Sequence, residues 1–186
     1  MKLSMSDLLK KLRKYNQRNY LQFVFCMTFS VLLITSYAVM LYSTIVQQTL
    51  PVGGDSRKQV MMIFAIAIIG CLIFIMYAAS LFLKYKSRET GVFLALGAKK
   101  KYLSQKLTIE MLQLMIACIA VGVVLGIGLA FLIWQIFQMV LSNLGDMSLG
   151  LSFTGIAIGL AFGLVSMVPV LVQLYQFVQR TDMMEI

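Results

Sequence analysis

The sequence predicts an all-α, polytopic membrane protein with four transmembrane helices. Of its 186 residues, 60% are hydrophobic and only 12% are charged, whereas soluble domains average about 45–50% apolar and about 25% charged residues. The mean hydropathy is +0.89. These values exclude an ordinary soluble domain, because a soluble core does not need so many apolar residues.

Four apolar stretches are long enough to cross a bilayer, which takes about 20 residues for about 30 Å of hydrocarbon. They lie at about residues 21–46, 60–83, 107–140 and 151–178. The third exceeds the bilayer thickness at about 1.5 Å per residue, so it must tilt or project beyond the lipid. The first is longer than the 7–15 apolar residues of a secretory signal, so we expect it to remain in the mature protein.

The basic residues predict the orientation. Fourteen of the sixteen Lys and Arg residues precede the first span, lie between the second and third, or follow the fourth, and only Arg57 and Lys58 lie in the other connections. The positive-inside rule therefore predicts cytoplasmic termini in a cell membrane. Because these residues flank apolar runs and form no stripe on a folded face, nucleic acid is not an expected partner. The two outer connections are short and leave no room for an extracellular domain.

The two ends of the chain are separate elements. In residues 1–20 apolar residues recur at helical spacing, with basic residues on the other side. This pattern predicts an interfacial amphipathic helix on an anionic leaflet; a disordered basic tail is the alternative. Residues 179–186 are expected to be a cytoplasmic tail or a linker to a second half of the protein.

The residue types give no indication of catalysis or metal binding. The chain has no histidine, and its three cysteines, Cys26, Cys71 and Cys118, lie inside apolar runs. There is no Walker A pattern and no pair of carboxylates within one span. Glu110 follows Lys106 by one helical turn and is expected to pair with it. The uncharged span interiors also make an ion-coupled carrier an unfavoured interpretation.

Small residues recur at every fourth position in the last two spans. They are Gly122, Gly126 and Ala130 in the third span and Gly155, Gly159 and Gly163 in the fourth. Such stripes allow close helix contact within lipid. We expect the third span to pack on the fourth through them; a seam with another subunit is the alternative.

The connection between the second and third spans is unusually apolar for a cytoplasmic loop. Its sequence is KSRETGVFLALGAKKK, residues 86–101. Ser87 is a candidate N-cap, and Gly97 stands where a helix-ending glycine is common, with three lysines beyond it. These features predict a short helix from about Arg88 to Leu96. Its apolar residues should dock either on lipid headgroups or in a groove of a protein partner.

This loop resembles a motif of the FtsX-like permease family, the membrane subunits of mechanotransmitting ABC transporters. The matching residues are Arg88, Glu89, Gly91, Ala95, Leu96, Gly97 and Ala98. The resemblance implies that loop 84–106 holds a coupling helix on a partner ABC ATPase dimer, which would bind ATP and Mg, while this chain holds no cofactor. The implied contact residues are Arg88, Glu89, Gly91, Phe93, Leu94, Leu96, Gly97 and Ala98.

The arrangement of the spans along the chain indicates which group within the FtsX-like permease family it resembles. Because no large domain separates the first two spans, the chain looks like the N-terminal four-span half of the BceB-like permeases of Gram-positive bacteria, which confer bacitracin and lantibiotic resistance. That resemblance implies removal or release of cell-wall-active peptide antibiotics, with the rest of the permease and a membrane histidine kinase as partners. The alternative function is a non-transporting adaptor or sensor that docks a histidine kinase or scaffold.

Overall fold

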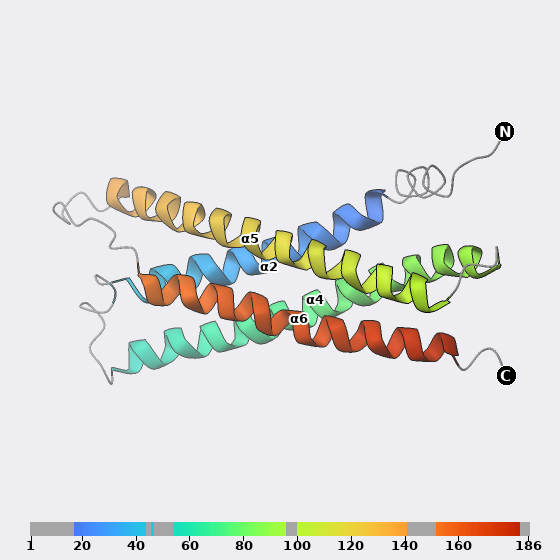
Figure 1. Ribbon diagram of the computed structural model, residues 1–186. Helices are drawn as coiled ribbons and strands as arrows, with labels where there is room; N and C mark the ends of the chain where they lie inside the picture. The colour runs from blue at the N-terminus through green and yellow to red at the C-terminus, as the bar shows by residue number, and fades with distance from the viewer. Residues whose placement is uncertain (1–16, 44–45, 47–53, 96–99, 141–151, 183–186) are drawn as a thin grey trace.

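A computed structural model describes residues 17–43, 46, 54–95, 100–140 and 152–182 (Figure 1). This part of the chain forms the helices α2 (Gln17–Leu41), α4 (Asp55–Ala95), α5 (Lys100–Val140) and α6 (Phe153–Asp182). Each contains a stretch long and apolar enough to cross a membrane, namely Tyr20–Leu41, Asp55–Ser87, Gln105–Met139 and Phe153–Phe177. The prediction of an all-α fold with four such helices is confirmed. The predicted interfacial helix in residues 1–20 lies almost wholly outside the described residues.

The four helices alternate in direction along one bundle (Figure 1). The start of α2, the end of α4, the start of α5 and the end of α6 lie together at one end of the bundle. We call this the basic end, because Lys84, Lys86 and Lys106 lie near it. The opposite end is formed by the end of α2 at Leu41, the start of α4 at Asp55, the end of α5 at Val140 and the start of α6 at Phe153.

Two of the helices are much longer than a bilayer is thick. α4 and α5 each contain 41 residues, which corresponds to about 60 Å at 1.5 Å per residue, against about 30 Å of hydrocarbon. The expectation that the third span must tilt or project beyond the lipid therefore applies to both helices. Both meet at the basic end (Figure 1).

The predicted separate helix from Arg88 to Leu96 is not a separate element. α4 runs without interruption from the second span to Ala95, so Ser87 lies inside a helix and is not an N-cap. The physical reason is local: residues 84–90 contain neither proline nor glycine. A new helix start requires a residue with non-helical backbone angles, and the continuous hydrogen-bond ladder of α4 leaves no place for one.

α2 contacts each of the other three helices. Phe23, Met27, Val31 and Ala38 on α2 are at most 1% exposed. Their spacing of about four residues defines one face of a helix, and the buried Ile34 and Thr35 widen that face. α2 is therefore the helix on which the bundle is assembled.

The glycines of α5 and α6 bring these helices into close contact with α2. A Cβ atom added at Gly126 would lie 2.8 Å from Cβ of Thr35 and 2.9 Å from the carbonyl oxygen of Leu32, and one at Gly155 would lie 2.6 Å from Cα of Val39. Gly122 and Gly159 likewise face α2, at Val31 and Thr35.

We expected the third span to pack on the fourth through these stripes. In the structure, most of the stripe glycines face α2 instead. Of the five stripe glycines, only Gly163 faces the other glycine-bearing helix, at Ile119 of α5, while Ala130 is fully buried. Small residues show where a backbone can approach closely, but they do not determine which helix approaches. Here the partner is the ridge of β-branched residues on α2.

A matched pair of substitutions on α5 tests this packing. Gly126→Ala should lower the stability of the bundle by about 1–3 kcal/mol, because the new methyl group overlaps backbone and side-chain atoms of α2. Gly128→Ala should be neutral or stabilising, because a Cβ at Gly128 meets nothing within 4 Å and alanine is the better helix former by about 1 kcal/mol. Thermal unfolding of both variants in detergent provides the measurement, and equal effects would contradict the assigned contact.

Candidate functional site at the basic end

The residues of the predicted coupling helix lie on the last two turns of α4. Arg88, Glu89, Gly91, Phe93 and Leu94 follow Ser87, where the membrane-length stretch of α4 ends. Gly91 is exposed, and a Cβ added there would meet nothing within 4 Å. Leu96, Gly97 and Ala98 lie outside the described residues. The structure thus presents the motif as a direct extension of a spanning helix, which we call the α4 extension (residues 88–95).

Just before the α4 extension, three helices meet in a polar cluster formed by Tyr20 of α2, Lys86 of α4 and Glu110 of α5. Nζ of Lys86 lies 3.6 Å from Oε2 of Glu110 and donates a hydrogen bond to the hydroxyl of Tyr20. That hydroxyl donates in turn to Oε1 of Glu110 at 3.4 Å. We call these residues the three-helix cluster.

The partner of Glu110 differs from the expected one. The sequence spacing predicts Lys106, one turn earlier on the same helix, but the structure pairs Glu110 with Lys86 of the neighbouring helix. The Lys86 side chain is 14% exposed and that of Glu110 is 32% exposed, whereas Lys106 is exposed. Charges at a shielded helix interface interact more strongly than charges in water, so the contact between helices is favoured over the local one.

Aromatic packing holds the three-helix cluster in place. The ring of Tyr20 meets Phe82 edge-on, with 4.9 Å between centroids, and Phe82 packs in turn on Phe23 at 5.2 Å. Edge-on and tilted contacts are the arrangements that aromatic rings prefer. Leu83 and Leu107 are also buried beside the cluster. The last turn of α4 before its extension is therefore fixed to α2 and α5.

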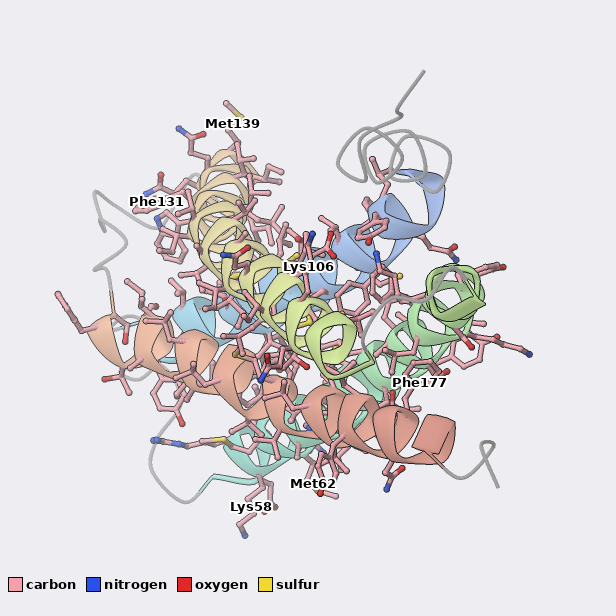
Figure 2. All side chains as sticks on the ribbon, turned by 45° about the vertical axis from the view of Figure 1, so that its right-hand side comes forward. Lys58, Met62, Lys106, Phe131, Met139 and Phe177 are labelled. Atoms are coloured by element: carbon pink, nitrogen blue, oxygen red, sulfur yellow. The ribbon has the colours of Figure 1, made fainter. Side chains whose placement is uncertain are left out.

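A groove of about 390 Å³ lies between α4 and α6 at the same end. Its lining residues are Ser80, Leu83, Lys84 and Ser87 of α4 and Gln173, Gln176 and Phe177 of α6. Figure 2 labels Phe177 on α6, close to α4, and Lys106 on the separate helix α5. Oε1 of Gln173 is shielded from solvent and accepts no hydrogen bond from the described residues.

The described helices bring together no group of three or more Cys, Asp or Glu residues that could hold a metal ion. Cys26, Cys71 and Cys118 form no disulfide bond, and each lies on a different helix. In this part of the chain, the features that could bind a partner or a ligand, or transmit a movement, are therefore the α4 extension, the three-helix cluster and the groove.

Sequence reasoning missed the three-helix cluster because its members come from three helices. Tyr20 and Glu110 are 90 positions apart, so no local spacing rule connects them. One signal was present: Glu110 is the only acidic residue of α5. A single acidic residue on an apolar helix indicates a partner on a neighbouring helix as readily as one on its own.

Comparison with known proteins supplies the family. Residues 61–183, about two thirds of the chain, match the family described as FtsX-like permease C-terminal. The chain belongs to the FtsX-like permease family. The resemblance that the loop motif indicated is confirmed.

Two curated relatives of this FtsX-like chain are bacitracin export permease proteins BceB. The protein from Bacillus subtilis is 27% identical over 151 residues, covering 81% of this chain and 23% of the relative. The protein from Halalkalibacterium halodurans is 27% identical over 143 residues, covering 76% of this chain and 21% of the relative. The chain thus spans about a quarter of the length of the relatives it matches. Four apolar helices and membership of a permease family make it a multi-pass membrane protein.

Two ion pairs within the described part of this FtsX-like chain allow a matched test of the three-helix cluster. Glu110→Gln should lower stability by about 1–3 kcal/mol, because it removes the carboxylate that pairs with the partly buried ammonium of Lys86. Asp55→Asn removes the exposed pair with Lys58, whose atoms are 3.5 Å apart and whose side chains are 70% and 94% exposed. It should cost less than about 1 kcal/mol.

Thermal unfolding in detergent measures both effects. The double variant Lys86→Glu/Glu110→Lys should recover part of the stability that Glu110→Gln loses. A loss no larger for Glu110→Gln than for Asp55→Asn would show that the cluster does not hold the helices together.

Proposed function

We propose that this chain is a membrane-spanning part of a mechanotransmitting ABC permease that acts on cell-wall-active peptide antibiotics. Its membership of the FtsX-like permease family and its similarity to two bacitracin export permeases support this proposal. On this proposal the chain itself hydrolyses nothing, and ATP and Mg are bound by a partner ABC ATPase dimer. The relatives are about three and a half times as long as this chain, so the rest of the permease would complete the assembly.

The continuity of α4 is the observation that carries the mechanism. The α4 extension would dock on the ATPase, and because α4 is one helix from Asp55 to Ala95, a displacement of its end moves the spanning part as well. Lys86 lies directly before the extension and is bonded to Tyr20 and Glu110. Movement received at the extension would therefore reach α2 and α5 through the three-helix cluster.

The charge distribution supports a cytoplasmic position for the basic end in a cell membrane. Lys84, Lys86 and Lys106 flank the apolar stretches there, and positive residues are retained on the cytoplasmic side. That orientation would expose the α4 extension to a cytoplasmic ATPase. It would also place both termini on the cytoplasmic side.

The output of the assembly would be release or expulsion of a peptide antibiotic from its lipid-linked target. A membrane histidine kinase is a proposed further partner, through which transport and detection of the antibiotic would be linked. The observation that supports the antibiotic class is the similarity to two permeases named for bacitracin export.

Charge and polarity changes in the α4 extension test the proposal. Glu89→Lys or Leu94→Asp should abolish co-purification of the chain with a partner ABC ATPase produced in the same cells, because docking needs the apolar surface and the charge that fixes its orientation. Lys58→Glu, a charge change at the opposite end, should leave co-purification unchanged. Membrane fractionation should show normal insertion for all three variants.

Two outcomes would contradict this account. ATPase recovery that is the same for Glu89→Lys, Leu94→Asp and the parent chain would remove the proposed docking role of the extension. If the parent chain instead co-purifies with a histidine kinase and with no ATPase, and if Glu89→Lys and Leu94→Asp abolish that co-purification, the adaptor function is favoured.

A further inference from the structure

The groove between α4 and α6 lies where the membrane-length stretches of both helices end. The membrane-length stretch of α4 ends at Ser87 and that of α6 ends at Phe177, and both residues line the groove. Its volume of about 390 Å³ falls in the range of small-molecule sites, about 300–1,000 Å³. A ligand in this groove would therefore have its polar part at the headgroup level.

The lining of the groove combines apolar surface with several polar groups and one cationic group. Of its seven residues, Leu83 and Phe177 are apolar and the other five carry hydroxyl, carboxamide or ammonium groups. Lys84 supplies one positive charge, and none of the seven carries a carboxylate. The groove is therefore matched to a ligand with one negative charge.

One lining atom also requires a hydrogen-bond donor. Oε1 of Gln173 is buried without a donor from the described residues, and a buried acceptor left unsatisfied is unfavourable. The Ser80 hydroxyl already donates to the carbonyl oxygen of Tyr77 at 2.9 Å. A ligand that fits the groove thus combines an anion for Lys84 with an O–H donor for Gln173.

We propose that this groove binds the headgroup of an anionic phospholipid of the phosphatidylglycerol type. Its phosphodiester provides the single negative charge that Lys84 attracts, and its glycerol provides hydroxyl donors for Gln173. The apolar walls, Leu83 and Phe177, contact the first carbons of the acyl chains. Basic pockets between transmembrane helices are suited to anionic headgroups.

Phosphatidylethanolamine is the informative comparison ligand. It carries the same phosphodiester and an ammonium donor, but its net charge is zero, and none of the seven described lining residues carries a carboxylate for the ammonium. The groove should therefore discriminate between the two lipids by charge. This inference does not depend on the proposed transport function, because binding of lipid is measured without an ATPase.

Native mass spectrometry of the full chain in detergent, titrated separately with dioleoyl-phosphatidylglycerol and dioleoyl-phosphatidylethanolamine, tests the proposal. The parent chain should bind phosphatidylglycerol more tightly. Lys84→Gln should weaken that binding about fivefold, the effect of about one basic residue at a membrane surface. Gln173→Leu should weaken it about two- to tenfold through the lost hydrogen bond.

Lys106→Gln is the matched control, because Lys106 is an exposed lysine near the same end of the bundle but on α5. It should leave the affinity for phosphatidylglycerol within about twofold of the parent value. Circular dichroism and gel filtration establish that each variant retains its fold. The proposal is overturned if phosphatidylethanolamine binds as tightly as phosphatidylglycerol, or if Lys106→Gln and Lys84→Gln weaken binding equally.

Discussion

The close approach of α5 and α6 to α2 is the constraint on which the bundle depends. Thr35 of α2 is fully buried and meets the backbone positions of Gly126 on α5 and Gly159 on α6. In lipid, apolar side chains gain little by leaving one apolar surface for another. Dispersion contacts at these close crossings therefore hold the helices together, and the three-helix cluster adds a polar contact at the basic end.

Much of the fold could be predicted from the sequence, because lipid imposes simple requirements. A span must be long, apolar and helical to satisfy its backbone hydrogen bonds, and each of the four predicted spans overlaps a helix long and apolar enough to cross a membrane. The partners of side chains were harder to predict. The glycine stripes indicated close contact but not that α2 would be the neighbour, and Glu110 had a local partner in Lys106 but pairs with Lys86. Both errors arise because helix adjacency is decided by tertiary packing.

At the candidate site, the motif residues were recognisable because they are contiguous in the sequence. Their presentation on an uninterrupted α4 was not predictable, because Ser87 also fits the N-cap of a new helix. The groove could not be predicted at all, since its two walls come from α4 and α6. At the basic end, the motif of the α4 extension could thus be recognised in the sequence. The three-helix cluster and the groove exist only when the helices are assembled.

The short distance along the chain from α4 to α5 limits how these helices can separate. Ala95 and Lys100 are joined by five peptide units, which reach at most about 18 Å when fully extended. The same two helices are joined again by the ion pair between Lys86 and Glu110. These two links at neighbouring levels, one covalent and one ionic, limit how far the ends of α4 and α5 at the basic end can move apart.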